Sequence, residues 1–343
     1  MSELLHEQEL GNWRRTHYSK ELQPSLENKE VIIMGWVSSI RSHGNIQFLV
    51  IRDRLGDTQV TAKRGQCPDK VLDELTRIKE HTSLAVKGKV RAQIKSPNGI
   101  EIVPTEVKIF SLVRQAAPFT IQANKSNVGI DTRLDLRAID LRRNFLRSIF
   151  SIRNTILNSV RAFLNMEGFI EVSTPKMIAT ATEGGAALFP IFYYNREAFL
   201  AQSPQLYKEQ LTMAFENVFE IGPIFRAEPS RTKRHLSEAT SIDVEKAFSD
   251  YNDLMHLLER MVIHVTRSIN EENHHELKYL KHKLPNIKIP FSKYRYDEII
   301  EKLQANGERV RWGDDINPQT IKSLSNEIID TDAFYFIVDW PTA

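Results

Sequence analysis

The chain has 343 residues, of which 41% are apolar and 26% charged, with a formal net charge of +2. This composition is ordinary for a globular protein, and the length suffices for two domains with a substantial core. The single cysteine excludes an internal disulfide framework and a cysteine-based zinc site. No secretory signal and no long apolar stretch are evident, so we expect a cytoplasmic protein without a membrane span.

The first third of the chain predicts a small β-barrel. Apolar residues at helical spacing predict a helix over 67–82, inserted between the third and the fourth of five short strands. Turn signals containing Gly, Pro, Asn or Asp separate the strands. This order is typical of an OB-fold, which often binds oligonucleotides across its second and third strands. The strands are expected at 31–37, 46–53, 58–62, 84–92 and 100–110.

A domain boundary is expected where the strand pattern stops. Residues 111–142 have no clean strand pattern and include a charge-dense segment. We therefore predict a barrel domain at 1–112, a linker at 113–142 and a second domain at 143–343.

The second domain is organised around two segments with a period of two residues, 219–228 and 239–248, which predict antiparallel strands. Amphipathic helices are expected at 143–166 and 252–270, and an apolar strand at 334–340. The loop between the two central strands is rich in basic residues, which suits a polyanion such as a triphosphate, although a solvated surface loop remains the alternative. Its basic residues are Arg231, Lys233, Arg234 and His235.

Several segments together resemble a known family. Phe225 to Glu228, followed by Arg234, His235 and Leu236, resembles the second signature motif of the class II aminoacyl-tRNA synthetases. TEGG at 182–185 and QSPQLYK at 202–208 resemble, more narrowly, the aspartyl enzymes of the archaeal and eukaryotic type. The resemblance implies an α+β multidomain fold, with an N-terminal OB-fold β-barrel and an antiparallel class II sheet flanked by helices.

The resemblance also covers the start of the second domain. A helix followed by a strand that ends at Pro175 resembles the first class II motif, which builds a homodimer interface in that family. A proline that merely ends an edge strand is the alternative. A third motif, a glycine-rich segment ending in arginine, does not follow residues 334–340. We therefore expect a C-terminally incomplete catalytic domain, without its own metal ligands and impaired in adenylation.

The reaction implied by the resemblance has two steps, and neither needs a protein nucleophile. ATP, with Mg²⁺, activates L-aspartate to aspartyl-adenylate, and the aspartyl group then passes to tRNA. The implied partners are tRNA(Asp), L-aspartate and a second copy of the chain, and tRNA(Asn) as a second tRNA is left open.

The resemblance implies an ATP site built on the second motif. Arg226 would act in catalysis by bridging the substrate carboxylate and the α-phosphate, since its planar guanidinium offers paired donors. Glu228 would accept the adenine amino group, while Arg234 and His235 would hold the distal phosphates. The whole expected ATP set is Arg226, Ala227, Glu228, Arg234, His235 and Leu236.

The resemblance implies an aspartate site around Lys208. A buried cation selects a carboxylate over an amide, because the amide would leave the charge unpaired. Glu183, Gln205 and Asp243 would surround the substrate ammonium. A solvent-facing lysine after Pro204 is the alternative interpretation. The expected substrate set is Glu183, Gln202, Ser203, Gln205, Lys208, Arg226 and Asp243.

In the barrel, Phe48 lies in the middle of a strand, where an exposed aromatic ring can stack on a base. The resemblance implies that it stacks on the middle anticodon base, with Arg41, Gln59 and Glu101 contacting the same loop. A core position for Phe48 is the alternative.

Two other functions of the chain remain open. One is that of an asparaginyl relative, which Lys208 disfavours, and the other is that of a non-catalytic, synthetase-like tRNA-binding protein.

Overall fold

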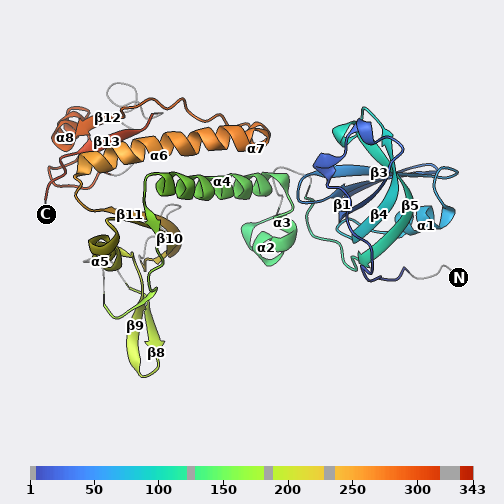
Figure 1. Cartoon of the computed structure of the whole chain (residues 1–343), viewed down its shortest axis with the longest axis horizontal. Coiled ribbons are helices and arrows are strands. Elements are labelled where there is room, and N and C mark those ends of the chain that lie inside the picture. Colours follow the sequence, from blue (N-terminus) through green and yellow to red (C-terminus); the bar gives the residue numbers. More distant parts are fainter. Residues whose placement is uncertain (1–4, 122–127, 181–187, 228–235, 317–332, 343) are drawn as a thin grey trace. The chain divides into compact units, whose positions relative to one another are not determined.

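The computed structural model describes residues 5–121, 128–180, 188–227, 236–316 and 333–342. The chain divides into two compact units, Met1–Arg147 and Ser148–Ala343 (Figure 1). Among the helices of the described ranges, none combines the length and the apolar character needed to cross a bilayer.

The first unit contains a closed five-stranded barrel, which confirms the predicted OB-fold. Its strands follow one another in the order β1-β2-β3-β5-β4, with antiparallel pairs except for the parallel pair β3 and β5. Short 3-10 helices η1 (Ser19–Glu21), η2 (Pro24–Leu26) and η3 (Pro97–Gly99) lie outside the barrel strands. The elements are β1 (Glu30–His43), β2 (Ile46–Arg52), β3 (Asp57–Lys63), α1 (Asp69–Arg77), β4 (Ser83–Ala92) and β5 (Ile100–Ser111).

Two predicted boundaries in this unit are wrong. Strand β1 runs to His43 rather than to residue 37, because after an irregularity between Val37 and Ser39 it continues to pair with β2. Helix α1 ends at Arg77 rather than at residue 82. His81 has a φ of 73°, which an α-helix cannot accommodate.

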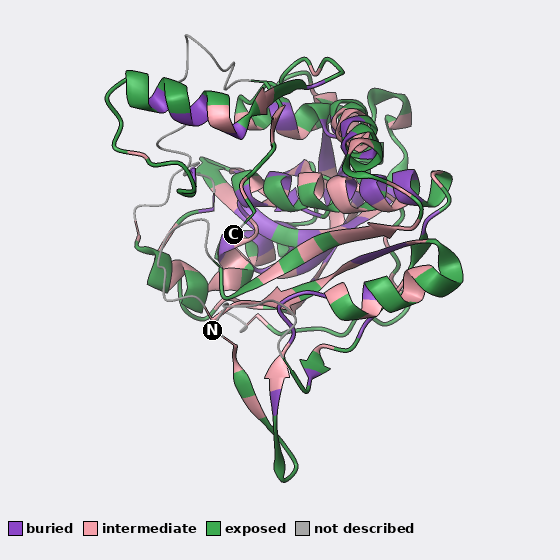
Figure 2. Ribbon diagram, turned by 90° about the vertical axis from the view of Figure 1, so that its left-hand side faces the viewer, coloured by how far each residue is buried: buried purple, intermediate pink, exposed green. Residues whose placement is uncertain are grey.

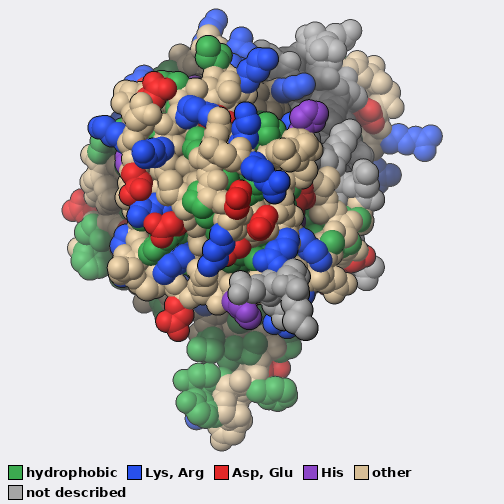
Figure 3. Space-filling view, turned by 90° about the vertical axis from the view of Figure 1, so that its right-hand side faces the viewer, with side chains coloured by type: hydrophobic (Ala, Val, Ile, Leu, Met, Phe, Trp, Pro, Cys, Tyr) green, Lys and Arg blue, Asp and Glu red, His purple; other side chains and the backbone are tan. Residues whose placement is uncertain are grey.

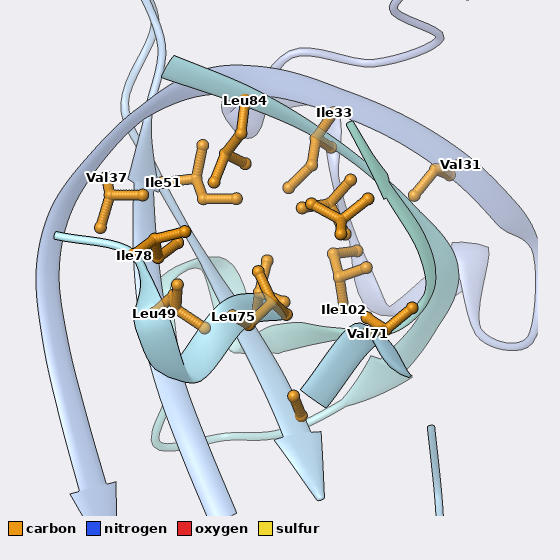
Figure 4. Close-up of a cluster of buried hydrophobic side chains, with 14 of the residues drawn as sticks. Val31, Ile33, Val37, Leu49, Ile51, Val71, Leu75, Ile78, Leu84 and Ile102 are labelled. Atoms are coloured by element: carbon orange, nitrogen blue, oxygen red, sulfur yellow. The ribbon is translucent and has the colours of Figure 1, made fainter. Parts of the chain in front are cut away.

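The barrel interior is filled by aliphatic side chains from the strands and from α1 (Figure 4). Two glycines allow close backbone contacts at its strand crossings. A Cβ on Gly35 would lie 2.3 Å from the carbonyl oxygen of Arg52, and one on Gly88 would lie 2.3 Å from that of Val103. The labelled core residues are Val31, Ile33, Val37, Leu49, Ile51, Val71, Leu75, Ile78, Leu84 and Ile102.

Two short helices, α2 (Ile130–Asp135) and α3 (Arg137–Asp140), follow the barrel. They hold Asp140, which is fully buried, among three guanidinium groups. Its carboxylate lies 3.1 Å from Arg133, 3.0 Å from Arg137 and 3.3 Å from Arg143. Burial acts to raise the pKa of Asp140, but hydrogen bonds and charge from Arg133 and Arg143 prevail and lower it.

The second unit is built on a three-stranded sheet in the order β11-β10-β6. Long helices α4 and α6 lie along this sheet (Figure 1), and apolar side chains such as Phe163, Phe219 and Leu257 form the core between them. The central strands thus appear as predicted, although β10 ends at Phe225, before Arg226. The bounds are α4 (Asn144–Met166), β6 (Ile170–Glu171), β10 (Asn217–Phe225), β11 (Glu238–Lys246) and α6 (Tyr251–Glu272).

The remaining elements form smaller layers of the second unit. The sheet β7-β9-β8 carries a hairpin whose tip includes exposed Phe192 and Tyr194 (Figure 2). Strands β12 and β13 pair in parallel and pack with α8 around buried Tyr296. The bounds are β7 (Met177–Ile178), β8 (Pro190–Tyr193), β9 (Arg196–Leu200), α5 (Gln205–Phe215), α7 (His274–Leu280), β12 (Ser292–Arg295), α8 (Tyr296–Ala305) and β13 (Tyr335–Val338).

Candidate functional site

The pairing of β10 with β11 determines which side chains share one face of the sheet. Glu220 lies opposite Asp243, and Val218 lies opposite Glu245. Because side chains alternate along a strand, these residues lie on the face away from Phe219, which packs against the helices. This face of the sheet therefore carries three carboxylates, those of Glu220, Asp243 and Glu245.

Helix α5 brings a cation to this acidic face. It begins directly after Pro204, whose carbonyl accepts a hydrogen bond from the Lys208 backbone. Lys208 is only 4% exposed, and its Nζ lies 3.2 Å from Asp243 Oδ1 and 3.5 Å from Glu245 Oε2. The alternative of a solvent-facing Lys208 is therefore wrong, and two of the residues predicted to hold aspartate are brought into direct contact.

The segment before α5 lies against the same region. Gln202 and Ser203 are buried, and the Gln205 backbone N–H donates to Ser203 Oγ at 3.3 Å. The Gln205 side chain donates instead to Glu209 Oε1 at 2.6 Å, along the helix. Gln205 is thus near Lys208 in sequence, but its amide is engaged within α5.

Backbone hydrogen bonds connect the end of β10 to this segment. Phe225 donates its N–H to the Ala201 carbonyl at 2.9 Å, and Arg226 donates its N–H to the Ser237 carbonyl at 3.0 Å. Arg226 and Ala227 are half-buried, whereas Leu236 is exposed. Arg226 therefore follows directly on the strand residue that is bonded to Ala201, the neighbour of Gln202.

Part of the expected site falls outside the described residues. These positions are Glu183, Glu228, Arg231, Lys233, Arg234 and His235.

The structure reveals a charged cluster that the sequence analysis missed. Glu220 is buried and accepts hydrogen bonds from the Thr174 backbone N–H at 2.9 Å and from the Thr174 hydroxyl at 2.8 Å. Lys176 Nζ lies 2.9 Å from Glu220 Oε1. An acidic residue within a strand that is otherwise apolar, Phe-Glu-Ile-Gly-Pro, is the signal that could have identified Glu220.

The barrel carries a separate cleft of about 710 Å³. Arg41, Phe48, Gln59 and Glu101, the four predicted anticodon residues, all line it. Phe48 pairs with Arg41 of β1, and Gln59 pairs with Glu101 of β5. The other lining residues are Ser39, Ser42, His43, Val50, Gln93, Lys95, Ser96 and Pro97.

Phe48 and Glu101 occupy different depths of this cleft. Phe48 is half-buried and absent from the barrel core, whereas its neighbour Leu49 is fully buried there. The core alternative for Phe48 is therefore wrong. Glu101 is 1% exposed and accepts hydrogen bonds from Gln59 at 3.1 Å, from the Thr61 hydroxyl, and from the Arg91 guanidinium. Its carboxylate is therefore buried and held by three side chains.

The outer surface of the barrel unit has mixed charge. Lys and Arg side chains are distributed over the visible face with Asp and Glu among them (Figure 3). Within the described part of the chain, no group of three His, Cys, Asp or Glu side chains could hold a metal ion.

Two family models match the chain. Residues 129–343 match "tRNA synthetases class II (D, K and N)", and residues 31–110 match "OB-fold nucleic acid binding domain". Among curated relatives, the aspartate–tRNA(Asp/Asn) ligase of Methanocaldococcus jannaschii is 45% identical over 96% of this chain and 75% of its own length. The protein of the same name from Saccharolobus solfataricus is 42% identical over 95% of this chain and 75% of its own length.

Solved structures give the same result. Asparaginyl-tRNA synthetase from Pyrococcus horikoshii, complexed with asparaginyl-adenylate, has a TM-score of 0.88 at 30% identity, covering 96% of this chain and 75% of that one. Aspartyl-tRNA synthetase from Entamoeba histolytica has a TM-score of 0.75 at 27% identity, covering 90% and 67%. The chain therefore belongs to the class II tRNA synthetases of the D, K and N group and is an aminoacyl-tRNA ligase.

Proposed function

We propose that this chain activates L-aspartate with ATP to form aspartyl-adenylate and transfers the aspartyl group to tRNA. The observation that carries the proposal is the burial of Lys208 against Asp243 and Glu245. We infer a cytoplasmic enzyme, in keeping with its relatives among tRNA ligases.

The charges at this site match the two ends of aspartate. Lys208, Asp243 and Glu245 are called the Lys208 cluster below. Its one cation and two carboxylates give it a formal charge of −1, which favours binding of the substrate ammonium group. The Lys208 ammonium group itself offers donors to the side-chain carboxylate. An asparagine amide would offer the ammonium group only a neutral oxygen, which is a weaker acceptor than a carboxylate.

Arg226 is proposed as the catalytic residue. Its guanidinium would bind both the α-carboxylate of the substrate and the α-phosphate of ATP. This would align the attacking carboxylate with the phosphorus atom and stabilise the negative charge on the phosphate oxygens. Its position supports this role, because Phe225 is bonded through its backbone to Ala201, next to Gln202. Ala227 and Leu236, with Glu228, Arg234 and His235, complete the proposed ATP site.

Magnesium is proposed only as a partner of ATP. The described residues supply no carboxylate cluster that could serve as a protein-built metal site. Within the described ranges, the proposal therefore gives Mg²⁺ no ligand from the protein.

The barrel cleft is proposed to bind the anticodon loop of tRNA(Asp), with tRNA(Asn) as a second substrate. Relatives whose names include both tRNAs support this choice.

We also propose a homodimer formed through helix α4 and the extended segment that follows it and ends at Pro175. Apolar side chains exposed at this place, Met166 and Ile170, support it.

Asparagine is the second candidate substrate. The structural similarity to an asparaginyl-tRNA synthetase at a TM-score of 0.88 favours it. Lys208 disfavours it, because a charged donor bonds more strongly to a side-chain carboxylate than to a neutral amide oxygen.

Amino-acid-dependent exchange of labelled pyrophosphate into ATP, measured with aspartate and asparagine in parallel, tests the proposal. Aspartate should support exchange at least tenfold better than asparagine in the original chain, and Lys208→Met should abolish that preference. The exposed Lys302→Met is the matched control and should behave like the original chain. A preference for asparagine, or a preference for aspartate that survives Lys208→Met, would overturn the assignment.

A further inference from the structure

We infer that Lys176 and Glu220 form a second charged pair in which Lys176, by neutralising Glu220, preserves the preference for an acidic over an amide side chain in the amino-acid site. The inference rests on the aspartate site proposed above and assigns a specificity role to two residues outside it. Both lie behind Asp243 and the Lys208 cluster and act on the bound substrate only through their electric field, and so they are not catalytic residues.

The first step is the placement of Glu220. It lies directly opposite Asp243 in the antiparallel pair of β10 and β11. Residues so paired have Cβ atoms about 4.5–5.5 Å apart on one face of the sheet. Glu220 is therefore a near neighbour of a residue that contacts Lys208, although its own ion pair is with Lys176.

The second step is the set of groups that bind the Glu220 carboxylate. Its carboxylate is 5% exposed, and an isolated charge so deeply buried would be costly. Three groups stabilise it: the Thr174 backbone N–H, the Thr174 hydroxyl and the Lys176 ammonium, whose Nζ lies 2.9 Å away. Lys176 Nζ also donates to Thr174 Oγ1 at 3.0 Å, which fixes its position. The pair is thus held as a buried anion beside a cation that is 23% exposed.

The third step is the charge balance over the whole face. Glu220, Asp243 and Glu245 supply three negative charges, and Lys176 and Lys208 supply two positive ones. The formal sum is −1, the same as for the Lys208 cluster alone. Lys176 thus cancels the field that Glu220 would otherwise exert on a substrate carboxylate bound at Lys208.

A backbone connection links the same pair to the site. The Lys176 carbonyl accepts a hydrogen bond from Ala201 at 3.0 Å, and the Ala201 carbonyl accepts one from Phe225 at 2.9 Å. Loss of Lys176 could therefore act through charge or through displacement of this backbone. The two causes predict different results for aspartate and asparagine.

The distinction follows from the chemistry of the two amino acids. Both carry the same ammonium and α-carboxylate groups, and only aspartate has a charged side chain. A displaced backbone weakens the binding of both, whereas a changed field alters the ratio of their dissociation constants. That ratio is therefore the decisive measurement.

The experiment measures binding of labelled L-aspartate and L-asparagine to the purified chain by equilibrium dialysis. Lys176→Met leaves Glu220 uncompensated and should lower the preference for aspartate about three- to tenfold. Glu220→Gln removes the negative charge and should raise the preference. The double variant Lys176→Met/Glu220→Gln should return it to within about twofold of the original chain.

Two controls separate charge from packing. Lys176→Arg keeps the charge and should keep the ratio, while Lys87→Met removes a half-buried lysine that is paired with carboxylates of the barrel and should change nothing. If Lys176→Met does not fold, the rise predicted for Glu220→Gln still tests the inference.

The outcomes are distinct. An unchanged ratio in both single variants, or a double variant worse than either, overturns the charge role while leaving the aspartate site intact, provided that Lys208→Met still lowers aspartate binding. No preference for aspartate in the original chain, or none lost in Lys208→Met, overturns the proposed function instead.

Discussion

Lys208 on α5 and Asp243 on β11 lie 3.2 Å apart, although 34 residues of chain separate them. Helix α5 places a buried cation against the half-buried face of β11 that carries Asp243 and Glu245. Because Asp243 and Glu245 remain partly open to water, the cluster can accept a substrate without first breaking a fully buried pair.

Replacing Lys208 by Met should affect binding far more than stability. The two carboxylates left behind are 20% and 30% exposed, so water can solvate them, and the free energy of unfolding should change by no more than about 1 kcal/mol. Urea unfolding monitored by circular dichroism measures this change. A loss of several kcal/mol would show that Lys208 serves the fold rather than the substrate.

Arg226→Ala should suppress pyrophosphate exchange at least a hundredfold and leave tRNA affinity within about twofold, because its guanidinium acts on the reacting groups. Filter binding with labelled tRNA provides the second measurement. Equal losses in exchange and in tRNA binding would argue against a role at the reacting groups.

Phe48→Ala should weaken tRNA binding by about 1–3 kcal/mol, the contribution of one base stacked on an aromatic ring. Leu55→Ala, which removes an exposed apolar side chain from a barrel turn, is the control. An unchanged tRNA affinity in Phe48→Ala would exclude stacking in this cleft.

Asp140→Asn should destabilise the first unit by about 1–3 kcal/mol, because three guanidinium groups lose their shared counter-ion. The pKa of Asp140 is lower in the folded state than in the unfolded chain. The stability that it contributes is therefore present above its unfolded pKa and is lost as pH falls through the folded value. Denaturation curves at neutral and acidic pH should converge for the original chain and Asp140→Asn.

His81 should give the first unit a second pH dependence, of the same sign but nearer neutrality. Burial lowers the pKa of His81, and the charge of Arg142 adds to this effect. The folded state thus favours the neutral ring, and stability decreases as pH falls below about 6.5, the usual histidine value. His81→Asn, which tolerates the positive φ, should flatten the melting temperature between pH 8 and pH 5. An unchanged slope would rule out His81 as its source.

Features of this protein that depend on neighbouring residues in the chain could be predicted from the sequence, whereas features that depend on residues far apart in the chain could not. The period of two in the barrel strands and around Phe219 predicted both sheets, because alternation records which face is buried. Local pattern was less informative at the ends of elements. Helix α1 ends at Arg77 because the following turn includes His81 at positive φ, and apolar spacing does not reveal this turn.

The sequence by itself determined the barrel, the central strand pair and the family, since each is encoded in periodicity or in a short motif. Only the tertiary structure decided that Lys208 is buried against Asp243 and that Lys176 neutralises Glu220. The physical reason is that burial and ion pairing depend on the register of β10 with β11 and on the docking of α5. Those contacts join residues far apart in the chain, where no local pattern specifies the partner.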